Sequence, residues 1–343
     1  MIRLGVDAWN LPGDRRGIGR YLREILRVWR ERHGNRVEVT LVVPEWHTWT
    51  VRAKYLREVD GFPYRVVSRA LHARAGLDAL WFPFNGCSWT NFDLPAIATL
   101  HDASNFVVPD YAPETAAIFR AAAEKCGVLL TVSQFARTEL ARELDVAPER
   151  LLPMAPGVNP PRPPQPVALD VAALQPFVLY VGAPEWRKGT DTLLDAMPLL
   201  AKARPEITLA LTTTLPDNAQ LPPNVRVAQL GYVDDATLAA LYRGCALLAF
   251  PSRYEGFGLP VLEAMSYGAP VVCSTAASLP EVAGDAAAYV PADDPSALAA
   301  AMHSVLDDHA YAEDLRRRGP PHAATFTWEA TAERTLAAIE SAT

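Results

Sequence analysis

Ser252-Arg253-Tyr254-Glu255-Gly256-Phe257-Gly258-Leu259-Pro260-Val261-Leu262-Glu263-Ala264-Met265 is the stretch that decides the fold of the second half of the chain. The apolar run 245–250 that leads into it predicts a buried parallel strand. A proline and two glycines then break the chain, and apolar residues resume at helical spacing over 259–267. The next apolar run, 271–273, starts another strand. The sequence therefore predicts a doubly wound α/β unit in which a glycine loop opens directly into a helix.

The glycine loop has the features of an anion site. It places backbone N–H groups at the start of a helix, where they suit a phosphate. Glu255 lies just before that site and Glu263 lies about two turns into the helix. Because carboxylates repel a phosphate, we expect both to accept hydrogen bonds from sugar or ribose hydroxyls. The alternative interpretation is an ordinary β-loop-α unit without a ligand.

A second strand-to-helix turn carries two adjacent cations. The predicted strand 177–182 is followed by Arg187-Lys188-Gly189 and by a predicted helix, 190–200. Arginine can grip two oxygens of a diphosphate and lysine adds a point charge. A solvated basic turn is the alternative for an Arg-Lys pair taken alone, and we expect a turn lysine to bury little surface.

The first half of the chain predicts a Rossmann-like parallel sheet, because its apolar runs are separated by segments that can hold crossover helices. The predicted strands are 2–8, 37–43, 64–68, 78–83, 96–100 and 128–132. The run 153–166 contains seven prolines and predicts a stiff linker. We therefore expect a first domain over 1–160 and a second over 167–326.

Four features of the first half are placed for contact with a ligand or a surface. His101 follows the strand 96–100, although a lone histidine is more often structural. Gly17 and Gly19 precede a predicted helix, 21–33, although a lone Gly-x-Gly is weak evidence. The face from Arg20 to Arg30 on that helix predicts a solvated surface, with a peripheral membrane contact as the alternative. Tryptophans at 46–49 and 84–89 fit either an acceptor site or core packing.

Composition limits the classes of protein. The 343 residues suit two domains, and 50% hydrophobic content excludes disorder. Residues 1–160 hold 20 Lys+Arg against 18 Asp+Glu, and residues 161–343 hold 12 against 21, so +2 and −9 give the net charge of −7. This balance argues against a nucleic-acid partner. Four scattered cysteines, no signal peptide and no apolar run of ~20 residues predict a cytoplasmic protein.

The spacing Glu255-x-Phe257-Gly258-x4-Glu263 resembles the signature of the large family of retaining glycosyltransferases with the GT-B fold, often called family 4. The family also has turns similar to Glu185-x-Arg187-Lys188 and His101-Asp102. The resemblance implies two Rossmann-like domains facing a cleft, with the last segment, 327–343, packing back on the first domain. Two departures are Ala183, where many members have arginine, and Trp186, where proline is common.

The resemblance also implies an activity: transfer of a sugar, with mannose slightly favoured, from a nucleoside diphosphate sugar to a glycan or lipid-linked acceptor. GDP-mannose is slightly favoured over UDP-sugars, and no further cofactor is expected. Since the sequence contains no Asp-x-Asp, we expect no divalent metal. A nucleotide-sugar epimerase of the same fold and a non-catalytic nucleotide- or glycan-binding protein are the alternatives.

Matching positions receive roles from the resemblance. His101 and Glu255 are expected at the donor sugar, Arg187 and Lys188 at the diphosphate and Glu263 at the ribose. These first four are the expected catalytic residues. The remaining expected donor contacts are Gly17 and Gly19, Tyr232 near the base, and the loop residues Gly256, Phe257, Gly258 and Leu259.

Overall fold

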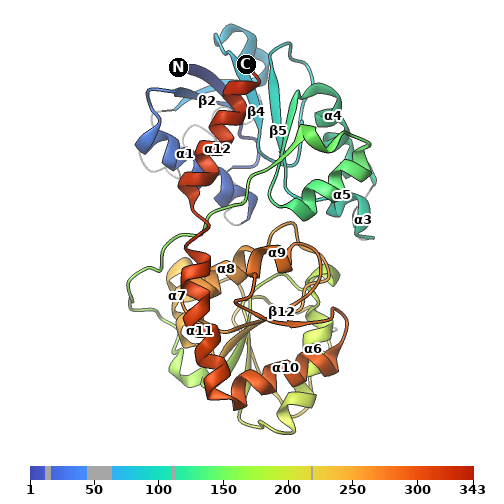
Figure 1. The fold of residues 1–343 in the computed structure, drawn as a ribbon, viewed down its shortest axis with the longest axis vertical. Helices are drawn as coiled ribbons and strands as arrows, with labels where there is room; N and C mark the ends of the chain where they lie inside the picture. Colours follow the sequence, from blue (N-terminus) through green and yellow to red (C-terminus); the bar gives the residue numbers. More distant parts are fainter. Residues whose placement is uncertain (12–16, 45–63, 110, 112, 218) are drawn as a thin grey trace. The chain divides into compact units, whose positions relative to one another are not determined.

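The computed structural model describes residues 1–11, 17–44, 64–109, 111, 113–217 and 219–343. The chain divides into two compact units, each with its own core. Unit 1 contains Met1–Gly157 and Thr327–Thr343, and unit 2 contains Val158–Phe326. Both are α/β units in which helices cover a parallel sheet (Figure 1).

Unit 1 is built on a sheet in the order β3-β2-β1-β4-β5-β6-β7, with every neighbouring pair parallel. Its strands are β1 (Ile2–Asp7), β2 (Val37–Val43), β3 (Arg65–Ser68), β4 (Ala79–Phe82), β5 (Ala96–Leu100), β6 (Val128–Thr131) and β7 (Leu151–Pro153). The central strands β4 and β5 are buried along their length, so they appear in the sequence as continuous apolar runs. The six predicted strands agree with these bounds to within one residue at either end, and β7 was not predicted.

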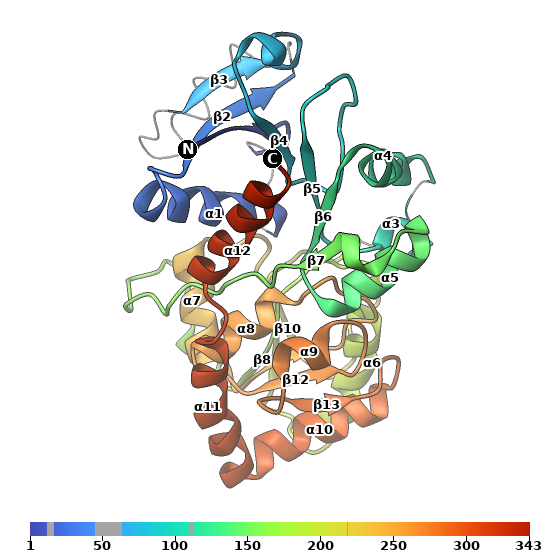
Figure 2. The same cartoon turned by 45° about the horizontal axis from the view of Figure 1, so that its top comes forward.

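The helices of unit 1 lie on both faces of this sheet (Figure 2). They are α1 (Ile18–Arg32), η2 (Arg69–Arg74), α3 (Ser104–Val107), η3 (Pro113–Ala116), α4 (Ala117–Lys125), α5 (Gln134–Leu144), η4 (Pro148–Arg150) and α12 (Trp328–Ser341). Helix α12 packs along α1, and the Trp29 indole Nε1 donates a 2.9 Å hydrogen bond to the Ala332 carbonyl. Gly157 permits the close approach of this segment, because a Cβ there would lie 2.1 Å from the backbone nitrogen of Trp328.

Unit 2 is built on a second parallel sheet, in the order β10-β9-β8-β11-β12-β13. Its strands are β8 (Phe177–Tyr180), β9 (Thr208–Leu211), β10 (Arg226–Gln229), β11 (Leu247–Phe250), β12 (Val271–Ser274) and β13 (Ala288–Val290). Its helices are η5 (Ala172–Leu174), η6 (Trp186–Lys188), α6 (Thr190–Ala201), α7 (Asp235–Gly244), α8 (Leu259–Ser266), α9 (Leu279–Ala283), α10 (Pro295–Asp307) and α11 (His309–Ala323). Helices α6 and α10 pack together over an apolar cluster of this unit, and α8 packs against α11.

The end of unit 2 contains two helices with a sharp boundary. Asp308 lies between α10 and α11, and its side chain caps α11 by accepting a hydrogen bond from the Tyr311 N–H. Helix α11 then continues through Pro320 and Pro321 to Ala323.

Each sheet has one point where the strand order reverses. In unit 1 this point lies between β1 and β4, and in unit 2 it lies between β8 and β11. Crossover connections leave such points in opposite directions, so a crevice forms beyond the carboxyl ends of the two strands, and ligands of doubly wound sheets bind there. Residues that follow these four strands are therefore placed to form ligand sites.

The arginine face of α1 has partners within the chain. Arg23 donates to the Leu11 carbonyl at 2.6 Å, and Arg27 forms ion pairs with Glu24 and Glu31. These contacts fit the predicted solvated surface, and the membrane contact stays a prediction. Among the residues that the structure describes, no helix combines the length and apolarity needed to cross a bilayer.

Candidate functional site

The Arg187-Lys188 turn is fixed against the loop that follows β11. Arg187 and Lys188 belong to η6, and Gly189 ends that turn with φ 64°. A Cβ at Gly189 would lie 2.1 Å from the Pro251 carbonyl oxygen, so only glycine allows this approach. The Arg187 carbonyl accepts hydrogen bonds from the Arg253 and Tyr254 N–H groups, at 2.8 and 3.2 Å. The β8/β11 reversal point therefore brings the two predicted motifs into contact.

Glu255 lies between the two cations. Its Oε1 is 2.5 Å from Lys188 Nζ and accepts a 2.9 Å hydrogen bond from Ser252 Oγ, and its Oε2 lies 3.8 Å from Arg187 Nη1. The side chains of Glu255 and Lys188 are only 8% and 14% exposed. The expectation that Lys188 buries little surface was wrong, because the loop after β11 folds over the turn and supplies a carboxylate partner.

The loop from Glu255 to Gly258 leads into α8 without a side-chain cap. Ser278 Oγ contacts the carbonyl oxygens of Glu255 and Phe257 at 2.9 and 2.8 Å and fixes the loop from below. Gly258 has φ 109° and is the N-cap residue of α8, whose first residue is Leu259. The helix start therefore presents backbone N–H groups and the positive end of the helix dipole beside Lys188 and Arg187, as the anion-site prediction requires.

A third cation, Arg253, fixes this arrangement and was given no role in the sequence analysis. Its guanidinium donates to both carboxylate oxygens of Asp191, at 2.7 and 2.8 Å, and also pairs with Asp293. It donates to the Trp186 carbonyl and lies 5.2 Å from the centre of that indole ring. The hydrogen bond to Asp191 raises the pKa of Arg253 above its ordinary value. Arg253 is thus bound to Asp191 and Asp293, whereas Arg187 Nε donates to Glu185 Oε2 at 2.7 Å and Lys188 pairs with Glu255.

The remaining predicted contacts of unit 2 lie further along the same sheet edge. Glu263 is on α8, where its Oε2 accepts a 3.0 Å hydrogen bond from the Tyr242 hydroxyl. Tyr232 follows β10, two strands away from β8, or about 10 Å across the sheet. It is 67% exposed. All the strands are parallel, so these residues share the carboxyl-end edge with the cations.

His101, Gly17 and Gly19 belong to unit 1. Gly17 has φ 55° and is the N-cap residue of α1, and Gly19 is buried in the first turn. The His101 ring packs edge-on against Tyr21 at 5.0 Å, and its Nε2 lies 2.9 Å from the Pro83 carbonyl oxygen. Burial lowers the pKa of His101 to about 4, so the ring is neutral at pH 7.

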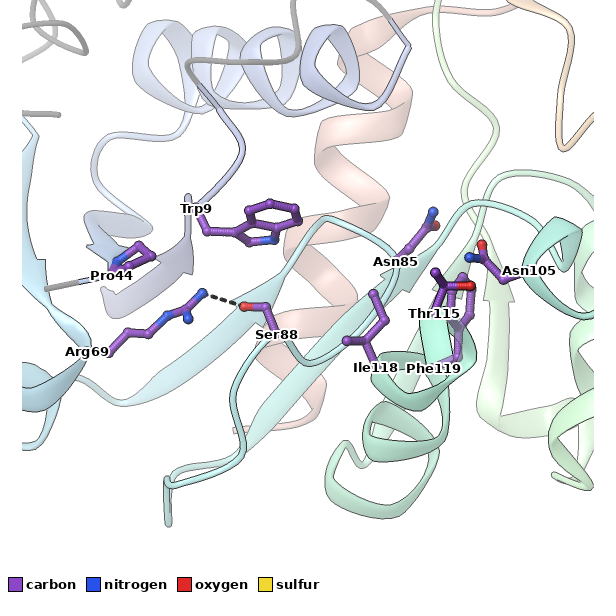
Figure 3. A pocket seen from close by; sticks show the side chains of 9 residues that line it. All are labelled: Trp9, Pro44, Arg69, Asn85, Ser88, Asn105, Thr115, Ile118 and Phe119. Carbon is purple, nitrogen blue, oxygen red and sulfur yellow. Dashed lines mark hydrogen bonds between the residues drawn. The ribbon is translucent and has the colours of Figure 1, made fainter. Parts of the chain in front are cut away.

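A pocket of about 490 Å³ opens at the β1/β4 reversal point of unit 1. Trp9 follows β1, Asn85 and Ser88 follow β4, and Asn105 comes from the short helix α3 after β5 (Figure 3). The segment 84–89 is one of the two segments whose tryptophans fit either an acceptor site or core packing. The other such segment, 46–49, lies outside the described residues.

Beneath this pocket lies a buried carboxylate that the sequence analysis missed. Asp7 is 2% exposed. Its carboxylate accepts a 2.5 Å hydrogen bond from Ser88 Oγ and forms an ion pair with Arg69 at 3.1 Å. Burial raises the pKa of Asp7, and the charge of Arg69 opposes that effect. The only sequence evidence for Asp7 was its place as an acidic residue at the carboxyl end of a buried strand. That evidence is weak, because its partner Arg69 lies more than sixty residues away.

Among the described residues, no group of three or more His, Cys, Asp and Glu side chains has the arrangement of a metal site. In unit 2, Lys188, Arg187 and Glu255 lie together, and Glu255 precedes the start of α8 by four residues. Such a set can hold a diphosphate by its charge and a sugar hydroxyl by a carboxylate oxygen.

Comparison with known proteins identifies the family. The family model described as Glycosyl transferases group 1 matches residues 175–308, which hold the cations and both glutamates. The O-antigen chain mannosyltransferase B of Escherichia coli is 33% identical over 276 residues, covering 73% of this chain and 72% of that protein. The chain belongs to the group 1 glycosyl transferases. It is therefore a glycosyltransferase, and the expected family is confirmed.

Other group 1 relatives and solved structures agree with this assignment. The MMP alpha-(1->4)-mannosyltransferase of Mycolicibacterium hassiacum is 32% identical, over 62% of this chain and 54% of that protein. Two solved structures share the fold of this glycosyltransferase. The sucrose-phosphate synthase of Thermosynechococcus elongatus has a TM-score of 0.74 at 20% identity, covering 99% of each chain. HepE of Anabaena in complex with UDP-glucose has a TM-score of 0.75 at 16% identity, covering 100% of each chain. The predicted fold, two parallel-sheet α/β domains of the GT-B type, is confirmed.

Proposed function

We propose that this group 1 glycosyltransferase transfers mannose, with retention of anomeric configuration and without a divalent metal, from GDP-mannose to a glycan or lipid-linked acceptor. Support for mannose comes from the relatives named mannosyltransferases. Support for a nucleotide-sugar donor comes from HepE, which was solved with UDP and with UDP-glucose. Retention and the choice of GDP come from the family resemblance and stay predictions.

The observation that carries the proposal is the cluster of Lys188, Arg187 and Glu255 beside the uncapped start of α8. Breaking the bond between sugar and diphosphate leaves additional negative charge on the departing phosphate. Cations and helix N–H groups that are already in place stabilise that charge without reorganising. In this proposal the diphosphate takes over Lys188 from Glu255, and no metal is needed to balance the charge.

Glu255 then becomes available to the sugar. A carboxylate oxygen released from Lys188 accepts a hydrogen bond from a sugar hydroxyl, while Ser252 keeps the side chain oriented. Glu263 binds the ribose in the same proposal, and Tyr232 lies near the base. His101, neutral at pH 7, has the role of a hydrogen-bonding neighbour of the transferred sugar and not of a charged acid.

We also propose that the enzyme acts in the cytoplasm. All four cysteines are buried free thiols, a state that suits a reducing compartment.

A donor panel tests the proposal directly. GDP-mannose, GDP-fucose, UDP-glucose, UDP-galactose and UDP-N-acetylglucosamine are screened by thermal shift in excess EDTA, and release of nucleoside diphosphate is then measured. We expect GDP-mannose to raise the melting temperature most and to be cleaved in EDTA, with the product sugar keeping the donor configuration by NMR. Activity that disappears in EDTA and returns with magnesium or manganese contradicts the metal-independent mechanism. Conversion of the donor to another nucleotide sugar, with no transfer, would indicate an epimerase.

A further inference from the structure

The pocket of unit 1 combines an aromatic face with a compensated charge. Trp9 is 40% exposed and has its indole ring at the pocket, held edge-on against Phe84. The volume of the pocket, about 490 Å³, lies within the ~300–1,000 Å³ that small-molecule sites span. Arg69 is the one charged side chain among the described residues that line it. The chemistry of the pocket therefore depends on how far the charge of Arg69 is neutralised.

The charge of Arg69 is neutralised from below. Arg69 Nη2 donates to Asp7 Oδ1 at 3.1 Å and to Ser88 Oγ at 2.6 Å, and Ser88 Oγ donates in turn to Asp7 Oδ2 at 2.5 Å. Asp7 is buried, so little solvent screens it from the guanidinium. A phosphate placed here would meet a cation that already has a carboxylate partner, and it would also be repelled by Asp7. The pocket is therefore poorly suited to an anion.

The opposite wall offers neutral hydrogen-bonding groups. Asn85, Asn105 and Thr115 lie across the pocket from Arg69 and Ser88, as Figure 3 shows. Asn85 also accepts a 2.8 Å hydrogen bond from the His101 N–H, which fixes its position. Side-chain amides and hydroxyls on one side and an indole face on the other match a molecule with many hydroxyls and a patch of C–H groups.

We propose that this pocket is an acceptor subsite for a neutral hexose, the terminal sugar of a glycan, with Trp9 as its stacking face and the Asp7-Arg69-Ser88 network as its selector against phosphate. The inference rests on the proposed function for its role as an acceptor site. It narrows the acceptor class, because a phosphate-bearing lipid headgroup is disfavoured at this place.

Binding of neutral and phosphorylated sugars to the full chain tests the subsite. The probes are the methyl α-glycosides of mannose, glucose, galactose and N-acetylglucosamine and the 6-phosphate of each sugar, titrated by ligand-observed NMR. We expect at least one neutral glycoside to bind more tightly than its phosphate. Trp9→Ala should weaken that binding about tenfold, while Leu71→Ala, which removes another exposed apolar side chain of unit 1, should not. The proposal is overturned if the phosphates bind best, if no neutral glycoside binds, or if Trp9→Ala binds like the wild type.

Replacing Asp7 gives a second test, in which the affinity for a phosphorylated sugar should rise. Asp7→Asn keeps the shape of the side chain and removes the charge that compensates Arg69. The affinity for the 6-phosphate relative to the neutral glycoside should therefore rise about tenfold or more. An unchanged ratio in a folded variant overturns the selector. If Asp7→Asn does not fold, Ser88→Ala takes its place, with a smaller rise expected because the ion pair remains.

Failure of the subsite and failure of the proposed function have different signatures. If the wild type transfers sugar but Trp9→Ala keeps the acceptor KM, the subsite is wrong and the function stands. If the neutral glycoside binds through Trp9 but no nucleotide sugar is cleaved, the subsite stands as a sugar site and the proposed function is wrong.

Discussion

The two points where the strand order reverses have the same topology, but they differ in how their cations are paired with carboxylates. In unit 1, Arg69 is matched by the buried Asp7, and the side chains around the pair are an indole, amides and hydroxyls. In unit 2, Lys188 pairs with the buried Glu255, and Arg187 pairs with Glu185, an exposed carboxylate of its own turn, at 2.7 Å. The buried pair of unit 1 suits a neutral sugar, whereas in unit 2 a diphosphate can take over two adjacent cations from their carboxylate partners. The same strand order thus supports two kinds of ligand, and the loops after the strands decide which.

Removing Lys188 from unit 2 should have the largest effect. We expect Lys188→Ala to lower turnover ~30- to 1000-fold, because a charge-assisted contact that strengthens in the transition state contributes roughly 2–4 kcal/mol. Measurement at saturating donor and acceptor isolates this step. Lys202→Ala, an exposed lysine at the end of α6, is the matched control and should keep full turnover.

The folded fraction of the Lys188 variant must be checked, because this lysine is mostly buried against Glu255. The double variant Lys188→Ala with Glu255→Gln removes both charges and guards against a simple folding defect. Near-wild-type turnover in a folded Lys188→Ala protein would remove the cations from the mechanism and with them the contrast between the two reversal points.

His101, beside the reversal point of unit 1, should make stability depend on pH. Its pKa is about 4 when folded against about 6.5 when unfolded, so the unfolded chain binds the extra proton between these values. The contribution of the neutral His101 ring to the free energy of unfolding is fully present above pH 6.5, and the free energy falls by about 3 kcal/mol as the pH drops toward 4. The difference in urea unfolding free energy between wild type and His101→Gln should change by that amount from pH 7.5 to 4.5. His309→Gln, exposed on α11, should show no such change; a flat difference for His101→Gln would mean that the ring is not held neutral.

Glu263→Gln should have the smallest effect of the three. A ribose contact persists from ground state to transition state, so its loss should raise the donor KM about tenfold and leave kcat nearly constant. Tyr242→Phe tests the hydrogen bond that orients Glu263, and it should shift the donor KM in the same direction by less. An unchanged donor KM in Glu263→Gln would remove this residue from the ribose.

Local sequence predicted most of the sheet and of the unit 2 site. Helix α5 and the glycine loop before α8 are specified by nearby residues: a Ser133 cap in one case, and a break of proline and glycines in the other. β7, β13 and the short helix α9 were missed because three to five residues carry too little pattern to be recognised. Tertiary contact decides such elements.

The contacts that complete each site were beyond local prediction. The adjacency of Arg187 and Lys188 was visible in the sequence, but the pairing of Lys188 with Glu255 joins residues 67 positions apart. The role of Arg253 depends on Asp191, and that of Asp7 depends on Arg69 and Ser88. A charge in a sequence does not state which partner will neutralise it. The distinction between the two reversal points therefore required the structure.

In the proposed mechanism Lys188 and Arg187 of unit 2, and not Arg69 of unit 1, bind the diphosphate. Calorimetric titration of GDP and of UDP in EDTA measures it directly, since the released nucleotide carries the charge that develops when the sugar departs. The account predicts that Lys188→Ala weakens binding of the preferred nucleotide by tenfold or more, while Arg69→Gln binds it as the wild type does. Unchanged nucleotide affinity in Lys188→Ala, or an equal loss in Arg69→Gln, would contradict it.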